Sequence, residues 1–85
     1  MNDDIIAAIA TSRLEAAISI IRLSGKDVIA FVQSFFSGRI IDKKTQTLTY
    51  GYIMDGDEKV DECLVSIYRG KHTFTGEEMV EINCH

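Results

Sequence analysis

Residues 48–68 carry the pattern that most restricts how this chain can fold, because two alternating runs flank an Asp-Gly pair. Period-two alternation is typical of a β-strand, whose successive side chains point to opposite faces of a sheet. Asp55-Gly56 lies between the runs and supplies the positive φ that a tight hairpin turn needs. The first run places its larger side chains at Leu48, Tyr50, Tyr52 and Met54. The second run is expected to place Cys63, Val65 and Ile67 on one face and Glu62, Leu64, Ser66 and Tyr68 on the other.

One helix is expected between the first strands and this hairpin. Ser24, followed three residues later by Asp27, is predicted to form a capping box at the helix start. The apolar residues that follow have the i, i+3, i+4, i+7 spacing of one helix face, namely Val28, Phe31, Val32 and Phe35. Ser37-Gly38 is predicted to end the helix, since glycine tolerates the left-handed conformation common after a C-terminus.

The remaining segments complete an α+β domain. Residues 4–11 and 16–25 are apolar runs that suit strands, residues 39–47 form a polar connector, and residues 78–85 form a final strand. The expected order is therefore two strands, a helix, two strands and a last strand. This order predicts a small mixed β-sheet with one main helix packed on it.

Length and charge limit the classes of function. The chain has 85 residues and 46% hydrophobic residues, which suits one small domain with a thin stability margin. Its apolar runs are far shorter than the ~20 residues of a membrane span, and it begins with no secretory signal pattern, so a cytoplasmic protein with no membrane association is expected. The net charge is −4 and the nine basic residues are scattered, which disfavours direct binding of nucleic acid by this segment.

The cysteines and histidines form no expected metal or catalytic site. Cys84 and His85 are adjacent on a strand and therefore point to opposite faces, while Cys63 and His72 are isolated along the sequence. The same separation leaves Cys84 without a base to activate it as a nucleophile. Two buried free thiols are expected, with one disulfide between Cys63 and Cys84 as the alternative.

Glu81 and Asn83 are expected on the face of the last strand opposite Val80, Ile82 and Cys84. Such a pair is either an ordinary solvent-exposed face or the wall of a pocket. As a pocket wall, a strand-borne carboxylate accepts two parallel hydrogen bonds from an N–H/NH2 edge, and a neighbouring amide both donates and accepts, which would suit a pterin ring.

Arg22 is the second candidate ligand-binding residue. It ends an apolar run on the face shared by Ile18 and Ile20. Its side chain either extends to the sheet edge or presents its guanidinium to an anionic or carbonyl group. The sequence contains neither G-x-x-x-x-G-K-[ST] nor G-x-G-x-x-G, so this segment alone is not expected to bind GTP or a dinucleotide.

Four short motifs, in order, resemble the N-terminal domain of the MnmE/TrmE family of tRNA modification GTPases. They are "RLSG" at 22–25, "TLTYG" at 47–51, "VDE" at 60–62 and "FTGEEMVEINCH" at 74–85. The resemblance implies a folate-binding fold related to that of aminomethyltransferases, a 5-formyltetrahydrofolate-type ligand and a homodimer. It also implies a longer parent protein with a helical domain and a GTP-hydrolysing domain that needs magnesium and potassium. With the flavoprotein MnmG (GidA), that parent would install an aminomethyl-type group at C5 of the wobble uridine of tRNA.

The resemblance also assigns roles to residues. The Arg of the family's R-[LI]-S-G motif falls on Arg22 and the last Glu of its G-E-[DE]-x-x-E motif falls on Glu81, both folate-contacting positions. Asn83 is added from strand geometry alone. The family's Pro- and Gly-bearing loop is replaced here by Ser12, Arg13, Leu14 and Glu15, which would change the fit of the ligand.

Residues 1–85 are therefore expected to be a truncated folate-binding and dimerisation domain that lacks the helical and G domains and is not itself catalytic. The alternative is a dimerisation or interaction module that does not bind folate.

Overall fold

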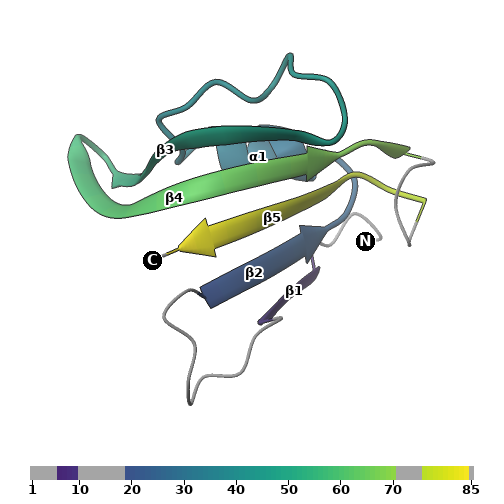
Figure 1. Cartoon of the computed structure of the whole chain (residues 1–85), viewed down its shortest axis with the longest axis horizontal. Coiled ribbons are helices and arrows are strands. Elements are labelled where there is room, and N and C mark those ends of the chain that lie inside the picture. The colour runs from purple at the N-terminus through teal and green to yellow at the C-terminus, as the bar shows by residue number, and fades with distance from the viewer. Residues whose placement is uncertain (1–5, 10–18, 71–75, 85) are drawn as a thin grey trace.

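The computed structural model describes residues 6–9, 19–70 and 76–84, which form a five-stranded sheet with one helix on one face (Figure 1). The elements in chain order are β1 (Ile6–Ile9), β2 (Ser19–Ser24), α1 (Val28–Gln33), β3 (Thr47–Asp55), β4 (Glu58–Tyr68) and β5 (Met79–Cys84). The predicted α+β class and element order are confirmed. None of the helices in this described part of the chain is long and apolar enough to cross a membrane.

The sheet is antiparallel throughout the described strands, so the prediction of a mixed sheet is wrong. The strand order is β1-β2-β5-β4-β3, and each neighbouring pair is antiparallel. β2 and β4 run in the same direction, but β5 lies between them and runs opposite to both. The last strand in sequence thus occupies the centre of the sheet, where neither β2 nor β4 can pair in parallel.

The hairpin of β3 and β4 forms as predicted. Asp55 pairs with Glu58, which leaves a two-residue loop, and Gly56 in that loop has a φ of 62°. The predicted inward face of β4 is also confirmed, because Cys63, Val65 and Ile67 are all buried. A shift of register between Ile53 and Met54 marks a bulge near the turn.

Helix α1 is shorter than predicted and packs on a different face. It ends at Gln33, four residues before Ser37, and Ser34 is its C-cap. Phe31, predicted to face the core, is 47% exposed, whereas Ile29 is buried together with Val28 and Val32. The chain leaves the helix early because Phe36 bridges to Ile53 at the edge of β3, which a longer helix would prevent.

The predicted capping box does not form. Asp27 is the N-cap residue, with a φ of 63° and no side-chain hydrogen bond to the helix. Instead, the backbone N–H of Ile29 donates to Glu78 Oε1 at 3.4 Å, so a carboxylate from the segment before β5 approaches the helix start. A carboxylate near a helix N-terminus interacts favourably with the unpaired N–H groups there.

Residues 35–38 cover the outer edge of β3. Met54 N donates to Phe35 O at 2.7 Å, and Ser37 N donates to Tyr52 O at 2.9 Å. These bonds occupy backbone groups that an open edge strand would expose to other chains. Gly38 does not adopt the predicted left-handed conformation. Glycine is needed there because a Cβ would lie 2.7 Å from the Phe36 ring.

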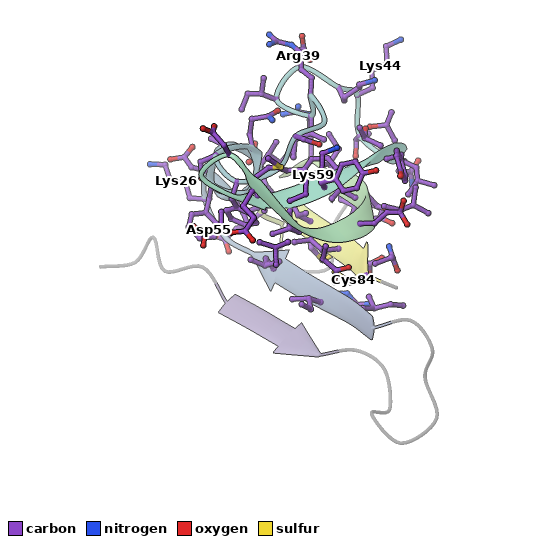
Figure 2. The ribbon with its side chains drawn as sticks, turned by 90° about the vertical axis from the view of Figure 1, so that its left-hand side faces the viewer. Lys26, Arg39, Lys44, Asp55, Lys59 and Cys84 are labelled. Carbon is purple, nitrogen blue, oxygen red and sulfur yellow. The ribbon has the colours of Figure 1, made fainter. Side chains whose placement is uncertain are left out.

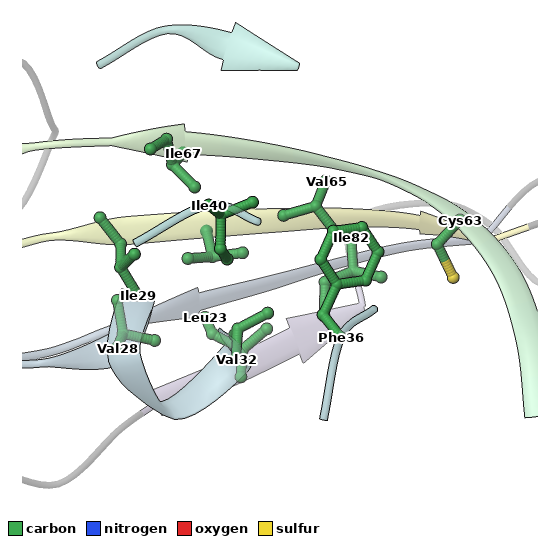
Figure 3. Packing of buried hydrophobic residues seen from close by; sticks show 11 residues of the cluster. Leu23, Val28, Ile29, Val32, Phe36, Ile40, Cys63, Val65, Ile67 and Ile82 are labelled. Atoms are coloured by element: carbon green, nitrogen blue, oxygen red, sulfur yellow. The ribbon is translucent and has the colours of Figure 1, made fainter. Parts of the chain in front are cut away.

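The core lies between α1, residues 36–40 and one face of the sheet (Figure 3). Ile40, within the segment predicted as a polar connector, is only 1% exposed and belongs to this core. The cluster comprises Leu23, Val28, Ile29, Val32, Phe36, Ile40, Cys63, Val65, Ile67, Val80 and Ile82. Because these residues fill the face that α1 covers, the alternate side chains of β2, β4 and β5 point to the opposite face.

Candidate functional site

The candidate site lies on the face of the sheet opposite α1, where Arg22 and Glu81 meet across β2 and β5. The two residues are directly paired in register although they are 59 positions apart. Arg22 Nε donates to Glu81 Oε2 at 2.7 Å, and Arg22 Nη2 lies 2.6 Å from the same oxygen. Arg22 is thus paired with a carboxylate of the same chain, and its role toward a ligand stays a prediction.

The geometry of this ion pair leaves it able to meet a ligand. Both of these close contacts use the same carboxylate oxygen, Oε2. The Glu81 side chain is 19% exposed and the Arg22 side chain is 41% exposed. The carboxylate is thus held in a defined orientation by a partner that itself remains open to solvent.

Asn83 lies two residues after Glu81 on the same strand and the same face, as predicted. It pairs with Ile20 on β2 and with Leu64 on β4. Its Nδ2 donates to Leu64 O at 3.4 Å, which is long for such a bond. The amide is therefore close to Glu81 but only weakly held by its neighbour. The structure brings all three predicted site residues, Arg22, Glu81 and Asn83, to one face.

An apolar and aromatic surface continues from Asn83 across the hairpin. Leu64 is paired with Asn83 on one side and with Tyr50 on the other. Leu64 is 40% exposed and Tyr50 is 55% exposed, so this row offers contact area for a flat ring or another protein surface. The Tyr50 hydroxyl donates to the Glu62 carboxylate, and this bond raises the pKa of Tyr50 above its ordinary value.

The thiols occupy the other face of the sheet. Cys84 packs against the core beside Ile82, as predicted, and both cysteines are free. Cys63 is isolated along the sequence but not in space, because its Sγ lies 3.0 Å from Cys84 Sγ across β4 and β5. Alternation had placed both thiols inward. Only the pairing of β4 with β5 could have brought them together.

Some sequence expectations fall outside the described residues. His72 and His85, considered as metal ligands, lie there, as does the loop of Ser12, Arg13, Leu14 and Glu15. Sequence reasoning missed Glu78, whose carboxylate contacts the start of α1 and lies 3.7 Å from Arg69 Nη1. Glu78 stands within the "GEEMVE" motif, but nothing in its spacing indicates the helix as its partner.

Comparison with known proteins gives consistent results over nearly the whole chain. Residues 5–85 match the family model described as GTP-binding protein TrmE N-terminus. The tRNA modification GTPase MnmE of Lactobacillus gasseri is 51% identical over 85 residues, covering 96% of this chain and 18% of that protein. The proteins of the same name from Alkaliphilus metalliredigens and Mycoplasmopsis pulmonis are each 44% identical, covering 98% and 100% of this chain and 19% of each relative.

The chain thus spans about a fifth of the length of these curated relatives. The match begins at residue 5 and includes β2 and β5, the two strands that carry Arg22, Glu81 and Asn83. On the extent of this match, the chain belongs to the TrmE N-terminal family, the N-terminal domain of tRNA modification GTPases of the MnmE type.

Proposed function

We propose that this domain binds a reduced folate of the 5-formyltetrahydrofolate type and serves a tRNA modification GTPase. The observation that carries the proposal is the Arg22–Glu81 pair, which fixes a partly buried carboxylate on the face opposite α1. In the proposed arrangement Glu81 binds the pterin edge, and Arg22 orients that carboxylate. A relation to the folate-binding fold of aminomethyltransferases belongs to the same proposal.

The chemistry of a pterin suits these residues. The 2-amino group and adjacent ring N–H of a pterin present two parallel donors, and a carboxylate accepts such a pair through its two oxygens. Arg22 has five N–H donors and its side chain is 41% exposed, so its guanidinium can also reach the ring carbonyl or a ligand carboxylate. Asn83 can exchange its long bond to Leu64 O for one to the ring. Leu64 and Tyr50 would then flank the bound molecule.

Removing the Glu81 charge should weaken folate binding strongly. A hydrogen bond to a charged group contributes about 1.5–3 kcal/mol, so Glu81→Gln should raise the Kd for 5-formyltetrahydrofolate by about 10- to 150-fold. Arg22→Ala should weaken binding similarly, because it frees the Glu81 side chain to adopt other rotamers. Isothermal titration calorimetry on the wild-type chain and on each variant measures both effects.

Glu58→Gln is the matched control, because Glu58 is an exposed carboxylate at the β3–β4 turn, away from Glu81. It should leave the Kd unchanged. Saturable binding that survives both Glu81→Gln and Arg22→Ala would refute the site assignment. Absence of any binding by the wild-type chain would refute folate binding by this domain alone.

For the whole protein, the proposal includes GTP hydrolysis and tRNA modification, the activities that the names of the relatives indicate. GTP hydrolysis, with its magnesium and potassium ions, would reside in a separate domain, since these 85 residues contain no P-loop motif. The modification of tRNA, together with the flavoprotein MnmG, would be an activity of that longer protein in the cytoplasm.

A second candidate function is dimerisation without folate binding, and exposed apolar side chains favour it. Leu48 is 60% exposed, Tyr50 55% and Leu64 40%, and all three lie on the face opposite α1. Exposed apolar residues that gather on one face commonly mark a surface of association. A second copy of the chain covering this face would also enclose a pterin ring bound at Glu81. Dimerisation and folate binding are therefore compatible.

Introducing a charge at the centre of this surface should prevent dimerisation. Leu64→Asp would bury an unpaired carboxylate in a dimer interface but leave it solvated in the monomer, so the dimer dissociation constant should rise by more than tenfold. Size-exclusion chromatography with light scattering measures the molar mass across a concentration series. Phe31→Asp is the control, because Phe31 is 47% exposed on the outer side of α1. A wild-type chain that stays monomeric throughout the series would contradict this candidate.

A further inference from the structure

Cys63 and Cys84 face each other at the end of the β4–β5 ladder. They are the last paired residues at that end of the two strands, and their Sγ atoms are 3.0 Å apart. Figure 3 shows Cys63 at one end of the buried cluster, beyond Phe36 and Ile82. Figure 2 shows Cys84 at the C-terminal end of β5. Both side chains are free thiols.

The two sulfurs differ in their access to solvent. Cys63 is 2% exposed, whereas Cys84 is half-buried and lines a cavity of about 320 Å³. Burial, followed by the hydrogen bond with Cys84, raises the pKa of the Cys63 thiol to about 12. Cys63 is therefore protonated at neutral pH, and a small reagent entering the cavity meets Cys84 first.

The surroundings favour a neutral product over a charged one. Asp61 is the third group near the pair, and its carboxylate and both Sγ atoms lie within 4.8 Å of one another. The cavity is otherwise lined by apolar residues, including Ile21, Phe35 and Ile53. A metal ion would require two thiolates beside a carboxylate in this setting, and tetrahedral zinc would hold the sulfurs about 3.7 Å apart. A disulfide adds no charge, and the 3.0 Å between the two Sγ atoms is shorter than the separation that zinc would impose.

We propose that Cys63 and Cys84 form a reversible intramolecular disulfide that fixes the end of β5 to β4. This modification site is separate from the proposed ligand face, although it lies next to Asn83 on the same strand. The oxidant is a small disulfide such as oxidised glutathione.

The reaction proceeds by two thiol–disulfide exchanges. Cys84, as the thiolate, attacks one sulfur of oxidised glutathione, breaks its S–S bond and releases one glutathione thiolate, which takes up a proton. Cys63 then loses its proton and attacks the Cys84 sulfur of this mixed disulfide, which releases the second glutathione. In total, two protein thiols and one oxidised glutathione give one protein disulfide and two reduced glutathiones. Two electrons pass from the protein sulfurs to the oxidant.

Oxidation should stabilise the fold measurably. The disulfide would close a loop between residues 21 positions apart and so restrict the unfolded chain. For a domain of this size the melting temperature should rise by roughly 10 °C or more.

To test the proposal, the 85-residue chain is treated with oxidised glutathione, and its free thiols, intact mass and melting temperature are measured. The chain contains only two cysteines, so a thiol titration in denaturant should fall from two to zero. The intact mass should decrease by about 2 Da, and the melting temperature should rise. Dithiothreitol should reverse all three changes. Cys84→Ser is the control, and it should show neither the mass decrease nor the rise in melting temperature.

The outcomes separate the proposal from other cysteine chemistry. Two thiols that persist, two added glutathiones, or a disulfide-linked dimer on a non-reducing gel would each overturn it. These measurements are made on the wild-type chain, so they test the proposal even if a cysteine variant fails to fold. None depends on folate binding, so failure here and failure of the proposed function are distinguishable.

Discussion

Exchanging Gln33 for glutamate should lower the free energy of unfolding by about 2–4 kcal/mol. The Gln33 side chain makes four hydrogen bonds with the segment that follows α1. Its Nε2 donates to Gly38 O at 2.8 Å and to Phe36 O at 3.3 Å, and its Oε1 accepts from the backbone N–H groups of Ile40 and Ile41 at 2.6 and 3.0 Å. The segment it holds carries Phe36 and Ile40 into the core.

Glutamate has nearly the same shape but, when ionised, cannot donate. The introduced carboxylate would place an anionic oxygen close to Gly38 O, and two carbonyl groups would lose their donors. An 85-residue domain has a total stability of about 4–13 kcal/mol, so this loss is a large fraction of it. Urea unfolding of the wild-type and variant chains at pH 7 measures the difference.

The control and the pH dependence make this prediction specific. Gln46→Glu makes the same chemical change at an exposed position and should cost less than about 0.5 kcal/mol. The carbonyl groups around position 33 favour the protonated form of the introduced carboxyl, so its folded pKa should exceed its unfolded pKa. The penalty should therefore be smallest near pH 4 and grow as the pH rises through the folded pKa. Equal penalties at positions 33 and 46 would refute the role of Gln33.

Replacing Gly51 with alanine should lower the free energy of unfolding by about 2–3 kcal/mol, which corresponds to a melting temperature lower by roughly 10–20 °C. An alanine Cβ at this position would lie 2.7 Å from Phe36 Cζ and 2.9 Å from Gly38 N. Phe36 is only 4% exposed, so its ring cannot move without disturbing the core. Gly38 N is a backbone atom, so it cannot move without displacing the segment that covers the edge of β3. Differential scanning calorimetry measures the shift.

Gly56→Asn is the matched control for this substitution. Nothing lies within 4 Å of a Cβ built at Gly56, and asparagine tolerates its φ of 62°. Its cost should therefore stay within about 1 kcal/mol. If Gly51→Ala costs no more than Gly56→Asn, then steric contact with Phe36 and Gly38 is not the reason for glycine at position 51.

The faces of β4 and β5 were predictable because alternation is a local property of an extended backbone. Each inward residue expected on β4 is buried, and Glu81 points away from Ile82 as expected. The helix face was not predictable in the same way. Apolar residues occupy positions 28, 29, 31, 32, 35 and 36, so several stripes fit a helical period, and the sheet selects the one that buries Ile29 and exposes Phe31.

In the candidate site, too, the residues could be predicted from the sequence but their contacts could not. Arg22 and Glu81 could be singled out from their residue types and motifs, but their contact depends on the pairing of β2 with β5. Likewise, both cysteines could be assigned to the core, but their 3.0 Å approach depends on the register of β4 and β5. Such pairings join positions 59 and 21 residues apart, and no local pattern specifies them.

Local sequence patterns were sufficient to identify the strands, to assign the strand side chains to faces, and to locate the tight turn at Gly56. Backbone geometry dictates these features over a few residues at a time. The position of β5 between β2 and β4, and therefore the residues that meet across the sheet, became known from the folded structure. Strand order and register are selected by burial of the whole apolar face at once, because a slip of one residue would turn every core side chain of β5 outward.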